Sequence, residues 1–221
     1  MTTARVEDTR TRLLEAAERL FAERGVDAVS LREITRESGA RNAIALQYHF
    51  EDRAGVLQAI FDKHMPEVDA RRHAMLDEYE ARGEPDLRAL ASALVRPLAA
   101  KLADRDGGLP FLQIYAELID RPQEPAAKAT DDSLQRWRLL MEPLLDEEAA
   151  RLHRRFTAIL HTTAELGRRA RTGPRADDRL FTSYLIDVVA AILGAPVSTE
   201  TRRLAKERDT RRKGKGLAHG A

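Results

Sequence analysis

The chain has 221 residues, 43% hydrophobic and 33% charged, a composition that suits one or two folded domains with a sizeable core. It contains no cysteine, which excludes disulfide bonds and thiolate metal sites. Lys and Arg number 37 against 36 Asp and Glu, so the net charge does not indicate a nucleic-acid partner. Neither an apolar run of the roughly 20 residues that span a bilayer nor a signal-peptide stretch occurs, so we expect a cytoplasmic protein without a membrane partner.

The N-terminal region has helical periodicity interrupted by short turns. A first helix is predicted over about 7–24, with apolar residues on one face and charges opposite. Ser30 precedes a second helix and Glu33 follows three residues later, the spacing of a capping box. Gly39 ends this helix after about two turns. The third helix, about 42–49, is also short, and we expect tertiary packing to hold both short helices in place.

Longer helices are predicted in the rest of the chain. One runs from about 52 to 80 and is kinked or divided by Pro66. The others cover about 86–103, 110–120, 131–147, 148–170 and 177–193. The tail from Ser198 onward includes TRRLAKERDTRRKGKGLAHG, which has 8 basic and 2 acidic residues. We expect this tail to be disordered, and the alternative is a basic arm that adds phosphate contacts. The sequence therefore predicts an all-α protein.

Two short helices joined by a Gly-containing turn of about four residues are typical of a helix-turn-helix. In that unit the second helix enters the major groove, where its first residues meet base edges and its flanks contact phosphates. Arg, Asn and Gln side chains form bidentate pairs with guanine or adenine, and a hydroxyl or an imidazole at the helix end suits a phosphate oxygen. The candidate DNA-binding residues are Ser30, Arg41, Asn42, Gln47, Tyr48, His49 and Arg53.

Several of these residues also have a purely structural interpretation. Arg41 and Asn42 are ordinary turn residues, and Asn in particular tolerates turn geometry and caps helices. Gln47 is also compatible with a solvated or phosphate-bound side chain, and His49 with a histidine buried in the core. Phe50 is expected to bury its ring and to fix the third helix against the fourth.

Three stretches together carry a resemblance to a known family: ERLFAERGVDAVSLREIT, the helix ending Tyr48-His49-Phe50, and EDRAGVLQAI. Their combination resembles the TetR family of bacterial transcriptional regulators over about residues 8–60. The resemblance implies an N-terminal three-helix DNA-binding unit and a larger helical domain that dimerises and usually binds a small effector. It also implies double-stranded DNA with a palindromic operator as the partner.

The chain departs from the family pattern around the third helix. Phe50 lies eleven positions after Gly39, where about ten are usual. Gln47 stands where an aromatic residue is common, and Arg53 where a lysine is usual. The longer turn rotates the start of the recognition helix, so whether Arg41 or Asn42 faces the bases is left open. We expect a DNA-binding domain over 1–52, an effector and dimerisation domain over 53–197, and the basic tail over 198–221.

The larger domain contains candidate ligand and dimer residues. Aromatic and apolar side chains at helical spacing suit either a core or a cavity for a largely apolar effector. The candidate pocket residues are Leu94, Leu98, Phe111, Leu112, Tyr115, Trp137 and Met141. Two helices near the C-terminus carry more apolar surface than one neighbour covers, which favours a two-fold four-helix interface. The candidate dimer residues are Phe156, Leu160, Phe181, Tyr184, Leu185, Val188 and Ile192.

The predicted function is that of a dimeric, sequence-specific transcriptional regulator, a repressor released by a small, largely apolar effector. One alternative is an all-helical enzyme with a histidine general base, but the sequence has no nucleophile-base spacing and no Gly-rich phosphate loop. Another is a DNA-binding regulator without an effector. His73 and Asp77 form one i,i+4 pair without a second ligand set, so no metal and no cofactor are predicted.

Overall fold

The computed structural model describes residues 2–40, 45–119, 121 and 132–217, and helices joined by turns and loops make up these ranges. No strand occurs in these ranges, which confirms the predicted all-α class. In chain order the elements are α1 (Thr2–Arg24), α2 (Leu31–Glu37), α3 (Ala45–Phe50), α4 (Arg53–Arg82), α5 (Leu87–Ala99), the 3-10 turn η1 (Ala100–Leu102), α6 (Gly108–Leu118), α7 (Asp132–Met141), the 3-10 turn η3 (Glu142–Leu144), α8 (Glu147–Arg151), α9 (Arg154–Ala170), α10 (Arg179–Gly194) and α11 (Thr199–Leu217).

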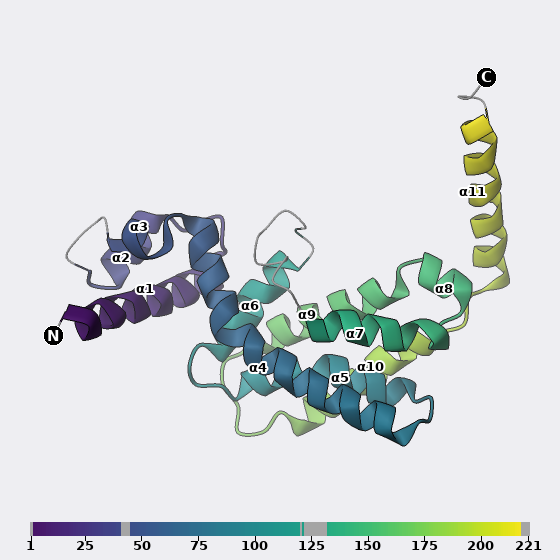
Figure 1. Cartoon of the computed structure of the whole chain (residues 1–221), viewed down its shortest axis with the longest axis horizontal. Helices are drawn as coiled ribbons and strands as arrows, with labels where there is room; N and C mark the ends of the chain where they lie inside the picture. The colour runs from purple at the N-terminus through teal and green to yellow at the C-terminus, as the bar shows by residue number, and fades with distance from the viewer. Residues whose placement is uncertain (1, 41–44, 120, 122–131, 218–221) are drawn as a thin grey trace.

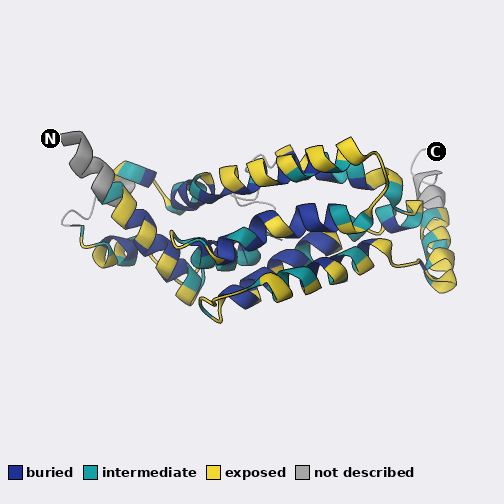
Figure 2. Cartoon of the chain, turned by 90° about the horizontal axis from the view of Figure 1, so that it is seen from below, coloured by how far each residue is buried: buried dark blue, intermediate teal, exposed yellow. Residues whose placement is uncertain are grey.

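The molecule has a small N-terminal unit and a larger helical body. Helices α1, α2 and α3 lie together at one end, and α4 leads from them into the body (Figure 1). Within the body α5 packs on α4 and α10, and α6 packs on α9. The buried residues gather on the helix faces that meet inside the body, while exposed residues cover the outer faces (Figure 2). Helix α11 extends from the opposite end of the body (Figure 1).

Apolar contacts hold the two short helices of the N-terminal unit, as their length predicts. Leu13 and Phe21 of α1 are buried together with Ile34 of α2 and Phe50 of α3. The guanidinium of Arg10 lies 5.3 Å from the centre of the Phe50 ring, the geometry of a cation–π contact. Burial of these few side chains supplies the stability that helices of 7 and 6 residues lack on their own.

Helix α4 is continuous through Pro66, so of the predicted kink or division at this residue the division is absent. The helix begins after Asp52, whose side chain accepts a hydrogen bond from the backbone N–H of Gly55. A Cβ atom at Gly55 would lie 1.9 Å from the carbonyl oxygen of Phe50, so the sharp corner between α3 and α4 requires glycine. Apolar residues are buried on both sides of Pro66, and their packing keeps the helix intact despite the missing N–H donor.

Buried polar contacts join the N-terminal unit to the body. Glu18 of α1 is almost fully buried and lies 2.9 Å from Nε2 of His64 and 3.1 Å from Nζ of Lys63, both on α4. At the end of α1, the backbone N–H of Val26 donates to both carboxylate oxygens of Glu117 on α6, at 3.2 Å. Because removing one partner would leave a buried polar group unpaired, these contacts fix the unit against the body.

Aromatic rings fill the centre of the body. Phe111 and Tyr115 of α6 stack with ring centres 5.7 Å apart, and Phe61 of α4 meets both rings edge-on. Trp137 of α7 is fully buried and donates from Nε1 to the carbonyl oxygen of Leu90 at 2.8 Å. The sole tryptophan is therefore held by packing and by a hydrogen bond in one fixed orientation.

Two of the predicted long helices are broken in the structure. The helix expected over 131–147 ends at Met141 and continues as a 3-10 turn containing Pro143, which lacks the N–H donor of a continuing helix. The helix expected over 148–170 is divided into α8 and α9 at Leu152 and His153. His153 has a φ of 58°, a left-handed conformation that no α-helix accommodates.

The C-terminal tail is helical up to Leu217, which corrects the prediction of disorder. The hydroxyl of Ser198 accepts a hydrogen bond from the backbone N–H of Thr201 at the start of α11. Arg202 pairs with Asp146 at 3.1 Å, and Arg203 pairs with Glu207 one turn along the helix. Lys, Arg, Glu and Leu have high helix propensity, which the prediction from charge alone underweighted.

No single helix in the described ranges combines the length and the apolar character of a membrane span, whereas α10 together with 199–211, bent by 55°, meets those two criteria as a pair.

Candidate nucleic-acid interface

Helices α2 and α3 form a helix-turn-helix on the support of α1. Both pack against α1 and against each other. The end of α2 is closed by Ser38, whose hydroxyl donates to the carbonyl oxygen of Thr35 and accepts from the backbone N–H of Ala40. Gly39 follows with a φ of 68°, which a residue with a Cβ adopts only at a cost. The turn therefore begins where the glycine in the sequence predicted.

The end of α3 presents polar groups to solvent. The side chain of Tyr48 is 77% exposed, while its neighbour His49 is half-buried and Phe50 is buried. The rings of Tyr48 and His49 meet edge-on with centres 5.2 Å apart. Burial of Phe50 fixes the end of the helix, while Tyr48 remains exposed to solvent.

Three predicted base-reading residues lie outside what the structure describes. Arg41 and Asn42 precede α3 in the undescribed range 41–44. The backbone of Gln47 belongs to α3, but its side chain lies outside the described part. Their proposed contacts with bases remain predictions.

Ser30 has the capping role that its spacing to Glu33 predicted. Its hydroxyl accepts from the backbone N–H of Glu33, and the Glu33 carboxylate accepts from the backbone N–H of Ser30 at 2.9 Å. Arg24 adds an ion pair to Glu33 at 2.8 Å. The hydrogen bonds from Ser30, backbone first, and then the bond from Arg24 lower the pKa of Glu33 to about 2. This cap orders the start of α2, which precedes the turn.

Arg53, predicted to contact the DNA backbone, has partners within the chain. Its Nη2 donates to the carbonyl oxygen of Val29 at 2.8 Å, and its Nη1 lies 3.7 Å from Asp27. These contacts tie the loop between α1 and α2 to the start of α4. A phosphate would have to compete with both, which favours a structural role for Arg53.

Two cations on α2 were missed by the sequence reasoning. Arg32 and Arg36 are exposed, and among the described residues neither has a carboxylate partner. Their i,i+4 spacing puts them one turn apart on one face of α2. In a helix-turn-helix the first helix crosses the DNA backbone, so this face suits phosphate contacts. The spacing in LREITRE was the available signal.

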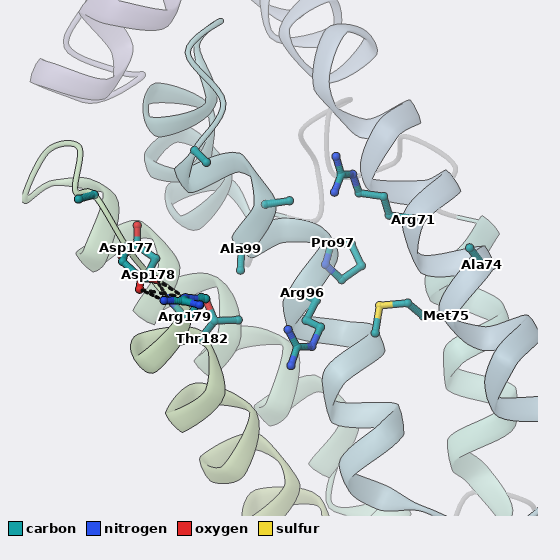
Figure 3. Close-up of a pocket in the computed structure, with 13 residues that line it drawn as sticks. Arg71, Ala74, Met75, Arg96, Pro97, Ala99, Asp177, Asp178, Arg179 and Thr182 are labelled. Carbon is teal, nitrogen blue, oxygen red and sulfur yellow. Dashed lines mark hydrogen bonds and ion pairs between the residues drawn. The ribbon is translucent and has the colours of Figure 1, made fainter.

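The predicted effector-pocket residues form part of the packed core. All seven are buried: Leu94, Leu98, Phe111, Leu112, Tyr115, Trp137 and Met141. A cavity of about 610 Å³ lies elsewhere, between α4, α5 and the start of α10, and none of the seven lines it (Figure 3). The body therefore has a cavity that lies outside the seven residues predicted to line a pocket.

The predicted dimer residues divide into three groups. Phe156 and Tyr184 are 43% and 67% exposed, and Leu180 beside them is 83% exposed. Leu185 is only 3% exposed and packs inside its own chain, which corrects its assignment to the interface. The remaining candidates are half-buried: Leu160, Phe181, Val188 and Ile192. Helices α9 and α10 pack against each other, so the exposed members lie on adjacent helices.

Two histidines of α4 contact residues of other helices. His64 is buried against Glu18, with its ring stacked on Phe111 at 4.6 Å between centres. His73 contacts Arg136, which also pairs with Asp77. No group of three or more His, Asp or Glu residues suited to a metal ion occurs among the described residues.

Comparison with known proteins gives a family and a fold. Residues 13–60 match the sequence profile of the bacterial regulatory proteins of the tetR family. The chain is similar in fold to the crystal structure of AmtR from Mycobacterium smegmatis, with 19% sequence identity, a TM-score of 0.54, and coverage of 89% of this chain and 91% of that one. No curated protein matches the sequence. The matched segment contains the helix-turn-helix described above, so the chain carries the N-terminal DNA-binding domain of the tetR family of bacterial regulatory proteins.

Proposed function

We propose that the protein is a dimeric repressor that binds a palindromic operator through α2 and α3 and is released by a small molecule. The observation that carries this proposal is the outward-facing Tyr48 at the end of a short helix whose own packing is complete through Phe50. We assign residues 1–52 to DNA binding and residues 53–197 to dimerisation and effector binding.

Within the DNA-binding unit, the proposed roles follow from exposure and partners. Tyr48 and His49 contact phosphates from the end of α3, and Arg32 and Arg36 contact them from α2. Arg41, Asn42 and Gln47 are the proposed base-reading residues because their side chains match guanine and adenine edges. Ser30 and Arg53 support the unit from within.

Dimerisation is proposed to bury the apolar side chains that α9 and α10 expose. Phe156, Leu180 and Tyr184 are large and lie on adjacent helices, and isolated monomers seldom leave such a group uncovered. A two-fold axis along these helices would pair the same surface of both chains. Two DNA-binding units related in this way would meet two half-sites of one operator.

A regulator without an effector is the second candidate, and the dense packing around Trp137 favours it. Trp137 is fully buried and hydrogen-bonded, so a ligand at that place would have to displace core contacts. The separate cavity beside α5 favours an effector instead.

Selection of bound sequences from random DNA with the purified protein tests the proposal. We expect enrichment of an inverted repeat whose half-sites lie about one helical turn, 34–36 Å, or a multiple of it apart. Gel retardation should then show that Tyr48→Phe weakens binding to the selected sequence and to unrelated DNA by the same factor, because phosphate contacts carry no sequence information. Tyr79→Phe, on α4 and away from the helix-turn-helix, is the matched control. Failure to enrich any repeat would refute sequence-specific binding by a dimer.

A further inference from the structure

The cavity beside α5 has an apolar floor and the size of a small-molecule site. Met75 of α4 and Pro97 and Ala99 of α5 face it, together with the start of α10 at Thr182 (Figure 3). Its volume of about 610 Å³ lies within the range of roughly 300–1,000 Å³ found for ligand pockets.

Five charged residues also line the cavity, and most of their charges are paired within the chain: Arg71, Arg96, Arg179, Asp177 and Asp178. Asp178 accepts two hydrogen bonds from buried Arg169, at 2.5 and 2.9 Å. Asp177 pairs with Arg179 at 2.7 Å. Both acidic groups of the cavity are therefore neutralised by neighbouring cations.

Arg96 is the lining cation for which the described part of the chain supplies no carboxylate. Its Nε donates to the hydroxyl of Ser92 at 2.8 Å, and this bond holds the guanidinium without neutralising it. Arg71 is only partly neutralised, because its partner Glu67, at 2.7 Å, also binds Lys101 at 2.5 Å. Lys101 first and Arg71 second hold the pKa of Glu67 below its usual value, so this carboxylate stays charged. The cavity thus carries an excess positive charge of about one unit beside an apolar floor.

We propose that this cavity binds an amphipathic monocarboxylate, with its carboxylate on Arg96 and its hydrocarbon part over Met75 and Pro97. A planar carboxylate matches the two parallel N–H donors of a guanidinium, and one negative charge balances the excess. The same occupant covers apolar surface that water otherwise contacts. That such a molecule also acts as the effector rests on the function proposed above.

A chain of polar contacts connects the cavity rim with the DNA-binding unit. Glu67, the partner of Arg71, binds Lys101, and Lys101 also binds Asp104 at 3.0 Å. Asp104 lies 3.8 Å from Nδ1 of His64, whose other nitrogen binds Glu18 of α1. A carboxylate bound to Arg96 adds a negative charge to the cavity that Arg71 also lines, and it therefore changes the charge balance of a cluster that ends on the support helix of the helix-turn-helix.

Calorimetric titration of the full chain with decanoate, and with uncharged 1-decanol as the matched probe, tests the site without DNA. We expect decanoate to bind and decanol to bind at least about tenfold more weakly. Arg96→Gln should weaken decanoate binding by about tenfold or more, whereas Arg105→Gln, which removes the same charge from an exposed loop outside the cavity, should not.

A second pair of variants tests where decanoate binds rather than which charge binds it. Ala74 lines the cavity and is exposed, so Ala74→Trp fills it without disturbing the core. Ala70→Trp, one turn earlier on the same exposed helix surface, leaves the cavity open. Decanoate binding should be lost in the first variant and kept in the second. Absence of binding to the wild type, equal affinity for decanol, or unchanged affinity in Arg96→Gln or Ala74→Trp would each overturn the proposal.

Gel retardation with the selected operator separates this proposal from the repressor function. Suppose that decanoate binding is lost in Arg96→Gln and Ala74→Trp as expected, but that decanoate does not release operator DNA from the wild type. This result supports the monocarboxylate site and refutes its role as the effector site. DNA release that persists in Ala74→Trp overturns the assignment of the cavity.

Discussion

The N-terminal unit and the larger body are stabilised in different ways. In the unit, helices of 7 and 6 residues depend on a capping box, a turn glycine and a few buried side chains. In the body, long helices share a core centred on Phe111 and Trp137, and their ends are tied by buried ion pairs such as Arg169 with Asp178. A unit held by local contacts adjusts to a DNA surface, whereas a densely packed body has discrete arrangements that a ligand or a partner selects.

The largest effect is expected from a comparison of a buried and an exposed residue on the same helix, α10. Leu185→Asp places an unpaired charge in the core and should cost about 3 kcal/mol or more of unfolding free energy. Tyr184→Asp, at the adjacent exposed position, should fold normally and yield monomers. Urea unfolding and light scattering measure the two outcomes.

Leu139→Asp is the control for the dimer, because Leu139 is 59% exposed on α7 and lies off the α9 and α10 surface. A Tyr184→Asp protein that remained dimeric would place the interface on other helices.

The next effect concerns the junction between the two regions. Gly107 has a φ of 83°, and a Cβ there would lie 2.3 Å from Oε2 of Glu18. Gly107→Ala must therefore displace a buried carboxylate from Lys63 and His64 in addition to straining the backbone. Gly83→Ala, with a φ of 68° and open space around its Cβ, is the matched control with strain of about 1 kcal/mol.

We expect Gly107→Ala to lose at least about twice the unfolding free energy that Gly83→Ala loses. Thermal unfolding of both variants under identical conditions measures the difference. Equal losses would mean that Glu18 moves freely and that the junction is not rigid.

Local chemistry was readable from the sequence, and contacts between distant residues were not. The capping pair Ser30 and Glu33 and the turn at Gly39 are set by neighbours within a few residues, so spacing predicted them. The hydrogen bond from Arg53 to the Val29 carbonyl was not predicted, because the two residues lie 24 positions apart in the chain. The net charge of the cavity depends on which of its arginines form ion pairs with carboxylates. Those pairs are set by the packing of α4, α5 and α10, which the sequence does not give.

A smaller effect tests the local stabilisation of the N-terminal unit. Ser30→Ala removes the cap of α2 and should cost about 1 kcal/mol at neutral pH. Folding lowers the pKa of Glu33 from 4.5 to about 2, so its contribution is present above pH 4.5 and is lost as the pH falls toward 2. The difference between Ser30→Ala and wild type should therefore shrink over that window.

Glu33→Gln provides the control for this pH dependence. In that background the effect of Ser30→Ala on the free energy of unfolding should be independent of pH between 5 and 2, within about the error of the fit. Persistence of the pH dependence would assign it to another carboxyl group.

The smallest effect distinguishes phosphate contacts from internal support within the unit. Arg36→Gln should reduce the salt slope of operator binding by about 0.9, the value for one phosphate contact. Arg53→Gln should leave the slope unchanged and lower the stability instead, because its donors serve Val29 and Asp27. Binding measured by fluorescence anisotropy over a salt series checks both, and a shallower slope for Arg53→Gln would restore its role as a phosphate ligand.

Because α4 is continuous, a movement of its end in the body is passed on to the N-terminal unit. The 30 residues of α4 form one continuous helix, about 45 Å along its axis at 1.5 Å per residue. A tilt of about 5° at the body end displaces the other end by roughly 4 Å over that length. In a dimer both α4 helices would tilt, and the displacements of their N-terminal ends would increase or decrease the distance between the two α3 helices. A movement too small to disturb the core is thus magnified into a mismatch with the fixed pitch of DNA.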